Sequence, residues 1–372
     1  MVYNRIKHVS PHFRFQGRFA QAQEVHSGNV NNTFILIYHQ GSETNSYTLQ
    51  RINTYVFKNP RSVMTNIAAV TDHLRKNIGA SRADVSRMAL EVIRTDDGDV
   101  MYLDGEGGTW RAYSYIPDAL ALDMVENLEQ MAEVGHAFGR FQRHLADFPA
   151  DKLFVTIPDF HHSTKRFYTF VRSVEEDRAG RVPALEDEIE FFFERRRMLG
   201  EIVRLLDRGE LPLRVTHNDT KSNNVLLDKK TGKALCVIDL DTVMPGSALY
   251  DYGDAVRFGA SNAPEDEPDV ARVSLNMDKA RAFTQGFVEE TAGFLTQAEL
   301  SRLPLGIKVI TAELAMRFLT DYLDGDRYFK VDYPEHNLVR ARAQMALLED
   351  VERKEEALYR MVTEDVRRFG GA

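Results

Sequence analysis

Cysteine is almost absent from this sequence: the 372 residues include one, Cys236. A single thiol excludes an intramolecular disulfide framework and is typical of a reducing compartment, and cysteines and histidines at finger spacing for a structural zinc site are missing. The chain also lacks any run of about 18 apolar residues, the length that a membrane-spanning helix needs. Its N-terminal stretch holds no apolar core of a secretory signal. We therefore expect a cytoplasmic protein with no membrane partner.

Positive charge is scarce as well, with 47 Lys and Arg against 56 Asp and Glu, a net charge of -9. No basic cluster suited to a duplex occurs, which argues against a nucleic-acid partner. The sequence also lacks GxxxxGK[ST], the loop of phosphate-binding nucleotide triphosphatases, and both GxGxxGxV and APE of protein kinases. What remains is an ordinary globular composition in a chain long enough for two lobes, each with its own core.

The first third of the chain predicts strands. Two β-rich runs, 33–38 and 47–53, flank a polar turn and predict a hairpin. A helix is expected over 61–77, where Pro60 precedes apolar residues at helical spacing. Further strands are expected at 89–93 and 108–116.

From Pro117 onward the pattern becomes helical, and only two short strand runs interrupt it, 224–227 and 234–238. Helices are expected at about 124–145, 185–208, 278–290, 297–302, 305–324 and 335–366. This segregation predicts the α+β class, with a strand-rich N-lobe at 1–117, a hinge near 115–118 and a mostly helical C-lobe at 118–372.

One segment carries a recognisable chemical pattern, VTHNDTKSNNVLL followed by VIDLDT. Phosphoryl transfer needs an acceptor held in line and cations that screen the phosphate charge. Asp219 supplies a carboxylate that can accept a hydrogen bond from an acceptor hydroxyl, and Lys221 can reach the transferring phosphate. Asn224 and Asp239 offer the hard oxygen ligands that Mg²⁺ prefers, at two strand ends that a hairpin brings together.

Alone, HxDxxxxN could be a turn with capping side chains, but here a strand, a turn and a second strand ending in aspartate follow it. That order is the kinase arrangement, so we expect a two-lobed protein-kinase-like fold. His217 is expected to hold the loop backbone, and Asp241 to be a second metal contact, a sugar contact or a turn residue. Asp251 and Asp254 are expected to bind backbone amides.

In the N-lobe, SGNVNN at 27–32 is a candidate loop over the phosphates, because glycine lets backbone N–H groups approach anionic oxygens. The alternative is an ordinary hairpin turn. Arg51 is a candidate phosphate contact or a surface strand residue, and the helix at 61–77 contains Asp72 but no glutamate to pair with it. The expected nucleotide contacts are Gly28, Asn29, Asn31, Arg51 and Ile116.

The chain resembles the aminoglycoside phosphotransferase and choline kinase superfamily and, within it, the N-acetylhexosamine 1-kinases. The resemblance rests on VTHNDTKSNNVLLD, VIDLDTVMPGSALYDYGDAVRFGAS, and MRFLTDYLDGDRYF with YPEHNLVRAR after it. It implies ATP bound between two lobes, Mg²⁺, and phosphorylation of the anomeric hydroxyl of N-acetylglucosamine or N-acetylgalactosamine. By position it makes Asp219 the base, Asn224 and Asp239 the Mg²⁺ ligands, and Arg317 and Tyr328 sugar contacts.

Several alternatives stay open. Arg51 departs from the superfamily's lysine, and Arg317 with Asp321, four residues on, could be a surface ion pair. A same-fold kinase for another sugar, an amino alcohol or a polycationic aminoglycoside is possible, the last because of an acidic loop at 264–269. A catalytically inactive nucleotide-binding module is a further alternative, against which the intact aspartates speak. A metal site at the adjacent His161 and His162 is disfavoured, since neighbouring side chains point apart.

Overall fold

The computed structural model describes residues 2–25, 30–79, 82–122 and 124–370, and the chain forms two compact units. Unit 1 comprises Met1–Leu120, Asp147–Ile157 and Leu226–Met244, and unit 2 comprises Ala121–Ala146, Pro158–Val225 and Pro245–Ala372. The sequence-based division at 117 and 118 differs from these units, because unit 1 includes two later segments. The second of them carries Asp239, whereas Asp219 and Asn224 belong to unit 2.

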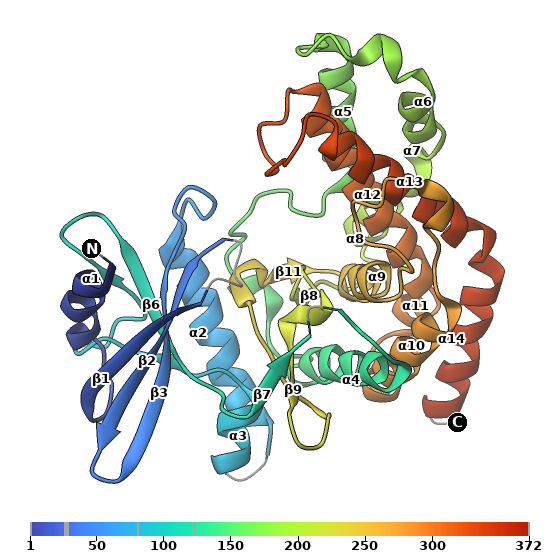
Figure 1. The fold of residues 1–372 in the computed structure, drawn as a ribbon. Coiled ribbons are helices and arrows are strands. Elements are labelled where there is room, and N and C mark those ends of the chain that lie inside the picture. The colour runs from blue at the N-terminus through green and yellow to red at the C-terminus, as the bar shows by residue number, and fades with distance from the viewer. Residues whose placement is uncertain (1, 26–29, 80–81, 123, 371–372) are drawn as a thin grey trace. The chain divides into compact units, whose positions relative to one another are not determined.

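Unit 1 is built on an antiparallel sheet with the strand order β1-β2-β3-β6-β4, and β5 pairs with β6 (Figure 1). The strands are β1 Arg18–Val25, β2 Asn32–Gln40, β3 Glu43–Arg51, β4 Val92–Ile93, β5 Tyr102–Leu103 and β6 Thr109–Ser114. The predicted hairpin is confirmed as β2 and β3. The strand expected at 89–93 is limited to β4, because the chain leaves a helix only at Met88.

The two faces of this sheet are covered by different helices. Strand alternation places Phe34, Leu49 and Trp110 on one face, where they pack with Ile6 and Val9 of α1. On the opposite face, Arg111 and Tyr113 of β6 reach the sulfur of Met64 in α2. The helices of unit 1 are α1 Val2–Val9, α2 Pro60–Asn77 and α3 Arg82–Met88. Any strand residue is therefore assigned to the α1 face or the α2 face by its position in the alternation.

A smaller sheet has the order β10-β9-β7, formed by β7 Ala119–Ala121, β9 Val225–Asp228 and β10 Ala234–Val237. Its β9–β10 turn matches the short strands that the sequence predicted near 224–238. Asp239 lies two residues after the end of β10 and has a positive φ of 59°.

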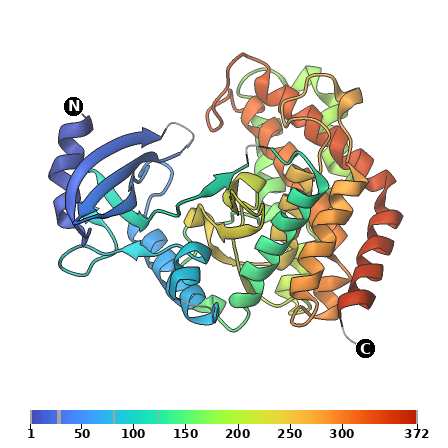
Figure 2. The ribbon, with the colours of Figure 1, turned by 60° about the horizontal axis from the view of Figure 1, so that its bottom comes forward.

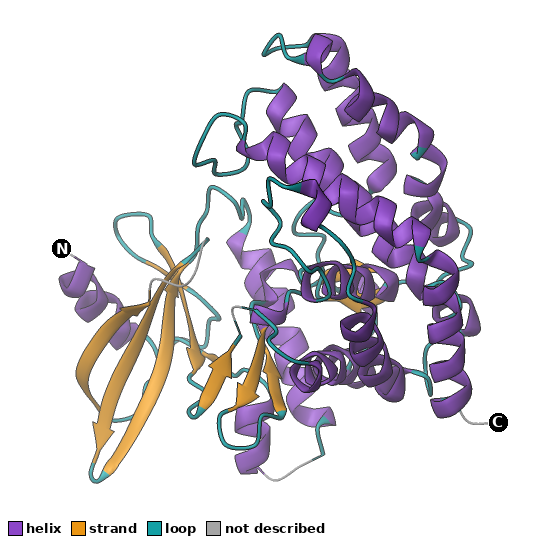
Figure 3. Cartoon of the chain, turned by 45° about the vertical axis from the view of Figure 1, so that its right-hand side comes forward, coloured by secondary structure: helices purple, strands orange, loops and turns teal. Residues whose placement is uncertain are grey.

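Unit 2 is helical apart from β8 Arg214–Thr216, which pairs with β11 Met244–Gly246 (Figure 3). Its helices are α4 Leu128–His144, α5 Ser163–Glu176, α6 Glu186–Glu194, α7 Arg196–Leu199, α8 Glu201–Asp207, α9 Ala248–Gly259, α10 Met277–Thr291, α11 Gln297–Leu300, α12 Leu303–Leu323, α13 His336–Arg353 and α14 Glu355–Phe369. The α+β class expected from the sequence is confirmed.

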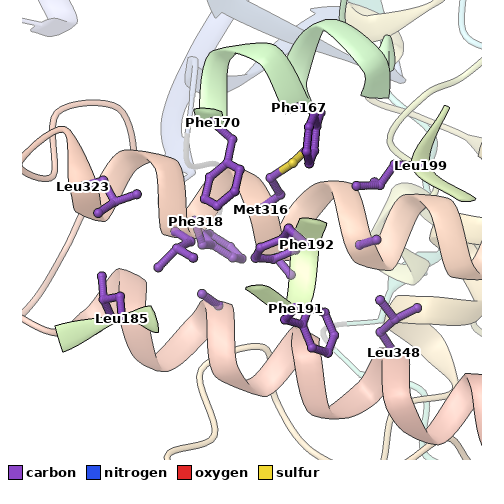
Figure 4. Close-up of a cluster of buried hydrophobic side chains, with 14 of the residues drawn as sticks. Phe167, Phe170, Leu185, Phe191, Phe192, Leu199, Met316, Phe318, Leu323 and Leu348 are labelled. Carbon is purple, nitrogen blue, oxygen red and sulfur yellow. The ribbon is translucent and has the colours of Figure 1, made fainter. Parts of the chain in front are cut away.

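Unit 2 is organised by one helix pair and by the contacts of α12 with three further helices. Helices α4 and α10 lie side by side (Figure 2), and α12 packs against α5, α9 and α13. Gly253 of α9 meets Gly306 of α12 so closely that a Cβ atom on either would overlap the facing backbone. Figure 4 shows the apolar cluster in which Phe167 and Phe170 of α5 pack with Met316 and Phe318 of α12. The α12 helix is thus a shared support for α5 and α9.

Two long predicted helices are interrupted. The helix expected at 185–208 is divided into α6, α7 and α8 at Arg195 and Gly200, and the one expected at 335–366 is divided at Lys354. There the Lys354 ammonium binds the Leu275 carbonyl and the Asp350 carboxylate, so a tertiary contact holds the break. Helices α1, α3, α5 and α9 and strands β1, β5, β7, β8 and β11 were not predicted. In the parts of the chain that the structure describes, no helix combines the length and the apolarity needed to cross a bilayer.

Candidate active site

Two carboxylates of α9 accept hydrogen bonds from the backbone of the loop after β8. Asp251 accepts backbone hydrogen bonds from His217 (2.9 Å) and Asn218 (2.8 Å), and Asp254 accepts one from Thr220 (2.9 Å). Asn218 has a positive φ of 64°, which gives the loop its sharp turn. The prediction that Asp251 and Asp254 bind backbone amides is confirmed. The loop therefore has a fixed backbone from which Asp219 projects.

Asp219, Lys221 and Asn224 lie together in unit 2. The Lys221 ammonium is 3.4 Å from the Asp219 carboxylate, whose charge is the main cause of the raised pKa of Lys221. Asn224 donates its amide N–H to the Asp219 carbonyl at 2.8 Å. The Asn224 amide nitrogen is bound to the Asp219 carbonyl, so the amide oxygen of Asn224 is on the side away from that carbonyl. An oxygen in this position can act as a ligand to a cation.

The donor set fits the metal that the family resemblance implies, since Asn224 and Asp239 both offer hard oxygen atoms. Asp239 belongs to unit 1, where it follows β10, and Asn224 precedes the neighbouring strand β9. Asp239 has a left-handed backbone conformation, which is uncommon for a residue with a side chain, and such residues concentrate at functional sites. Within the described residues, no group of three or more histidine, cysteine, aspartate or glutamate side chains is gathered as a metal site.

His161, for which the sequence suggested only a disfavoured metal site, connects the loop to α12. Its Nε2 lies 3.2 Å from the Asn218 carbonyl and its Nδ1 lies 3.0 Å from the Glu313 carboxylate. Both partners are acceptors, so both ring nitrogens must carry protons. Burial opposes this charge, but Glu313 and the Asn218 carbonyl outweigh it and raise the pKa of His161. The His161 imidazolium thus connects Asn218, the residue before Asp219, to helix α12, which also carries the predicted sugar contact Arg317.

Arg317 lies one helical turn after Glu313 and is surrounded by aromatic rings. Its guanidinium carbon is 5.9 Å from the ring centre of Phe160, 5.8 Å from that of Tyr328 and 5.4 Å from that of Phe329. The surface ion pair with Asp321 is absent, because that carboxylate instead accepts the backbone N–H groups of residues 327–329. The predicted sugar contacts Arg317 and Tyr328 are therefore brought together, with the arginine donors left for a ligand.

Arg317, Tyr328 and Phe329 line a cavity of about 110 Å³ in unit 2. Its lining residues are Arg166, Thr169, Met316, Arg317, Thr320, Asp321, Asp324, Tyr328 and Phe329. Arg166 was missed from the sequence. Its signal would have been the helical spacing of Phe167, Phe170 and Val174, which defines α5 and assigns Arg166 to its first turn.

Asp241 was predicted to contact metal or substrate, but in unit 1 its carboxylate accepts hydrogen bonds from Arg111 and Asn31. It is 4% exposed, and its two oxygens accept a bidentate pair of hydrogen bonds from Arg111, the second at 3.0 Å. Asn31 adds a third donor at 2.8 Å, while the Asn31 oxygen accepts the backbone N–H of Asn53. Asn31, expected above the phosphates, thus links β2, Asn53 and the turn after Asp239. Gly28 and Asn29 lie outside the described residues.

Arg51 lies on the α1 face of the sheet. It pairs in register with Trp110, and it lines a cavity of about 520 Å³ with Arg5, Glu24 and Asp104. The neighbouring register pair, Gln50 and Arg111, is on the opposite face with Asp241. The arginine that shares a face with the Asp239–Asp241 turn is therefore Arg111. Ile116, the last of the expected nucleotide contacts, is buried just after β6.

The acidic loop at 264–269 makes contacts within unit 2 through its side chains, although Asp266 stays 48% exposed. Each of its four acidic side chains is bound within unit 2. The pairs are Glu265 with Arg257 at 2.5 Å, Asp266 with His336 at 3.3 Å, Glu267 with Arg272 at 3.4 Å, and Asp269 with the Ala271 N–H at 3.2 Å.

Comparison with known proteins gives a consistent result. Residues 21–283 match the model of the phosphotransferase enzyme family, APH. The fold is similar to a microcompartment-associated aminopropanol kinase, with a TM-score of 0.59 at 14% identity over 96% of this chain and 98% of that chain. It is also similar to an aminoglycoside phosphotransferase from Alicyclobacillus acidocaldarius (TM-score 0.60, 12% identity, 97% and 96% covered) and to a choline kinase from Cryptosporidium parvum (TM-score 0.58, 13% identity, 99% and 100% covered).

At these identities the structural likeness establishes the protein-kinase-like fold alone, while the family model spans more than half of the chain. The chain therefore belongs to the phosphotransferase enzyme family, APH.

Proposed function

We propose that this phosphotransferase uses ATP to phosphorylate the anomeric hydroxyl of N-acetylhexosamines, giving the 1-phosphate. One observation carries the proposal: the loop that presents Asp219 is joined through His161 and Glu313 to the helix that presents Arg317. A phosphoryl acceptor must be bound and held in line beside the base, and this unit contains a base and a binding cavity on connected elements.

In the proposed reaction, Asp219 accepts the hydrogen bond of the anomeric hydroxyl and takes its proton as the new oxygen–phosphorus bond forms. The bond between the γ-phosphorus and its bridging oxygen breaks, and ADP leaves with that oxygen. Lys221, kept charged by Asp219, stabilises the transferring phosphoryl group. Asn224 and Asp239 would hold Mg²⁺, which screens phosphate charge when bound. An anomeric hydroxyl is more acidic than an ordinary alcohol, so a carboxylate with a late proton transfer suffices.

The N-acetylhexosamine assignment is supported by the motif around Arg317 and Tyr328 and by the geometry of that pair. A tyrosine face and a guanidinium that forms no ion pair within the described residues suit a neutral sugar with hydroxyl and amide oxygens.

The test is ATP consumption with free sugars, choline, ethanolamine and aminoglycosides as acceptors, followed by phosphorus NMR of the product. We expect turnover with N-acetylglucosamine or N-acetylgalactosamine and a phosphorus signal coupled to the anomeric proton. Turnover with choline or an aminoglycoside and none with the sugars would overturn the proposal.

A further inference from the structure

Asn66 is a buried amide in the middle of helix α2. It is 1% exposed, and its side chain is bound at both the nitrogen and the oxygen. The Nδ2 group donates to the Phe154 carbonyl (2.8 Å) and to the Val243 carbonyl (3.0 Å), and Oδ1 accepts the Phe154 backbone N–H (2.9 Å). Two carbonyls and one N–H fix the orientation of the amide, and neither leucine nor aspartate, the side chains of similar size, could satisfy them. Asn66 thus connects α2 to two other segments of unit 1.

One of these segments is the turn that begins at Asp239. Val243 donates its N–H to the Leu240 carbonyl at 3.2 Å, and this bond closes the turn. The Val243 carbonyl then accepts the hydrogen bond from Asn66. We call residues 239–243 the Asp239 turn. A single closed turn therefore separates the Asn66 contact from the proposed Mg²⁺ ligand.

The backbone conformation of Asp239 depends on contacts of this kind. A left-handed residue with a Cβ atom is unfavourable and persists only where the surrounding structure determines it. Arg111 binds Asp241 two residues later in the Asp239 turn, and Asn66 binds Val243 four residues later. Mg²⁺ requires near-ideal octahedral geometry, so the direction in which each ligand projects matters. The contacts from β6 and α2 together fix the backbone from which the Asp239 carboxylate projects.

Helix α2 lacks the glutamate by which protein kinases connect a helix to the phosphate site. In those enzymes a glutamate of the helix pairs with a lysine of the sheet, and activity needs this pair and the metal aspartate in place together. The single acidic residue of α2, Asp72, lies 3.4 Å from Arg94, and Arg51 is on the α1 face of the sheet. In this chain the connection from α2 runs instead through the uncharged amide of Asn66.

We propose that Asn66 is a positioning residue for metal-dependent nucleotide binding: through Val243 it keeps the Asp239 turn in the conformation in which Asp239 can hold Mg²⁺. This role rests on the proposed function for Asp239 as a Mg²⁺ ligand, but not for the identity of the acceptor. Loss of the Asn66 side chain releases Val243 and lets the Asp239 backbone relax toward a commoner conformation. The carboxylate then projects in a different direction, and the metal is bound less tightly.

The experiment measures ADP binding by calorimetry, once with Mg²⁺ and once with EDTA. Asn66→Ala should weaken binding of ADP with Mg²⁺ by roughly 10- to 100-fold, the usual loss when a residue that orients a metal ligand is removed, and should change metal-free binding little. Thr71→Val is the matched control, because Thr71 is as deeply buried in α2 but bonds to the Ile67 and Ala68 carbonyls of the same helix. The control should leave both affinities unchanged. Equal losses with and without Mg²⁺ in Asn66→Ala, or no loss, would overturn the inference.

A second measurement uses the wild-type protein and remains decisive if Asn66→Ala does not fold. Coupling between two sites is reciprocal, so if the Asn66 contacts favour metal binding, bound metal must stabilise those contacts. The Phe154 backbone N–H donates to Asn66, and its amide hydrogen exchange reports on them. Adding Mg²⁺ to the protein with ADP should slow this exchange more than that of the Ile78 N–H, which bonds to the Leu74 carbonyl of α2. Equal slowing at the two amides, or none, contradicts the proposed role.

The two proposals fail in different ways. Asp239→Ala tests the ligand assignment and should remove most of the gain in ADP affinity that Mg²⁺ gives. If that gain stays intact in Asp239→Ala, Asp239 is not a ligand, and the roles of Asp239 and Asn66 are both wrong. If Asp239→Ala removes the gain and Asn66→Ala does not reduce it, Asp239 is a ligand and Asn66 is merely structural. Absence of turnover with N-acetylhexosamines contradicts the acceptor assignment and leaves the nucleotide measurements valid.

Discussion

Replacing Asp241 by asparagine distinguishes a substrate contact from a buried anchor. The carboxylate and its partner Arg111 are 4% and 2% exposed, and Asn31 completes the hydrogen bonds. Removing one member of such a pair leaves a buried charge uncompensated, and the usual cost is about 3–5 kcal/mol. We therefore expect Asp241→Asn to lower the unfolding free energy of unit 1 by about that amount, roughly 10²- to 10⁴-fold in the folded-to-unfolded ratio.

The chain provides its own probe for this measurement. Its single tryptophan, Trp110, is buried in β6 beside Arg111, so tryptophan fluorescence during urea unfolding follows unit 1. Arg61→Met, which removes an exposed ion pair with Asp99 in the same unit, is the control and should cost less than about 1 kcal/mol. Adding Arg111→Met to Asp241→Asn should restore much of the loss, because the unpaired charge is then gone. If Asp241→Asn is as stable as the control and instead raises KM for the sugar alone, Asp241 is a substrate contact and the reasoning is refuted.

Three further predictions concern unit 2. Asp219→Asn should lower kcat by about 10²- to 10⁴-fold, with nucleotide binding by calorimetry retained; near-normal turnover would exclude Asp219 as the base. Arg317→Ala should reduce kcat/KM for the sugar by an amount equivalent to a loss of roughly 1.5–3 kcal/mol of binding free energy, with little change in KM for ATP. Equal losses for both substrates would indicate a structural role. The raised pKa of His161 means that the imidazolium stabilises the fold below the ordinary histidine pKa and loses this effect as pH rises through the raised value. The stability difference between wild type and His161→Gln, measured by urea unfolding, should therefore shrink as the pH rises above the ordinary histidine pKa of about 6.5, and a difference that grows would show that the ring is bound neutral.

Local features were predictable because neighbours along the chain decide them. Periodicity located α2, α10 and α12 and the β2–β3 hairpin. Asp251 and Asp254 were expected to bind backbone amides, but the amides belong to the loop at 217–220, which lies more than 30 positions away, so the tertiary structure chose these partners. The close spacing of Asp219, Lys221 and Asn224 brings them into one loop in any compact fold. The face of Arg51 was also open to prediction, since a period of two assigns it to the same side as Tyr47 and Leu49.

By itself the sequence determined the family motif, the class of fold and the grouping of Asp219, Lys221 and Asn224 in one loop, because each depends on residues a few positions apart. Only the tertiary structure decided how distant charges pair. Arg111 meets Asp241 across 130 positions and His161 meets Glu313 across 152, and many other carboxylates in the chain could have served each cation equally well. Burial made the choice: a charge that leaves water needs a partner at fixed geometry, and only packing of the sheet on α2 and of α5 on α12 determines which partner is within reach.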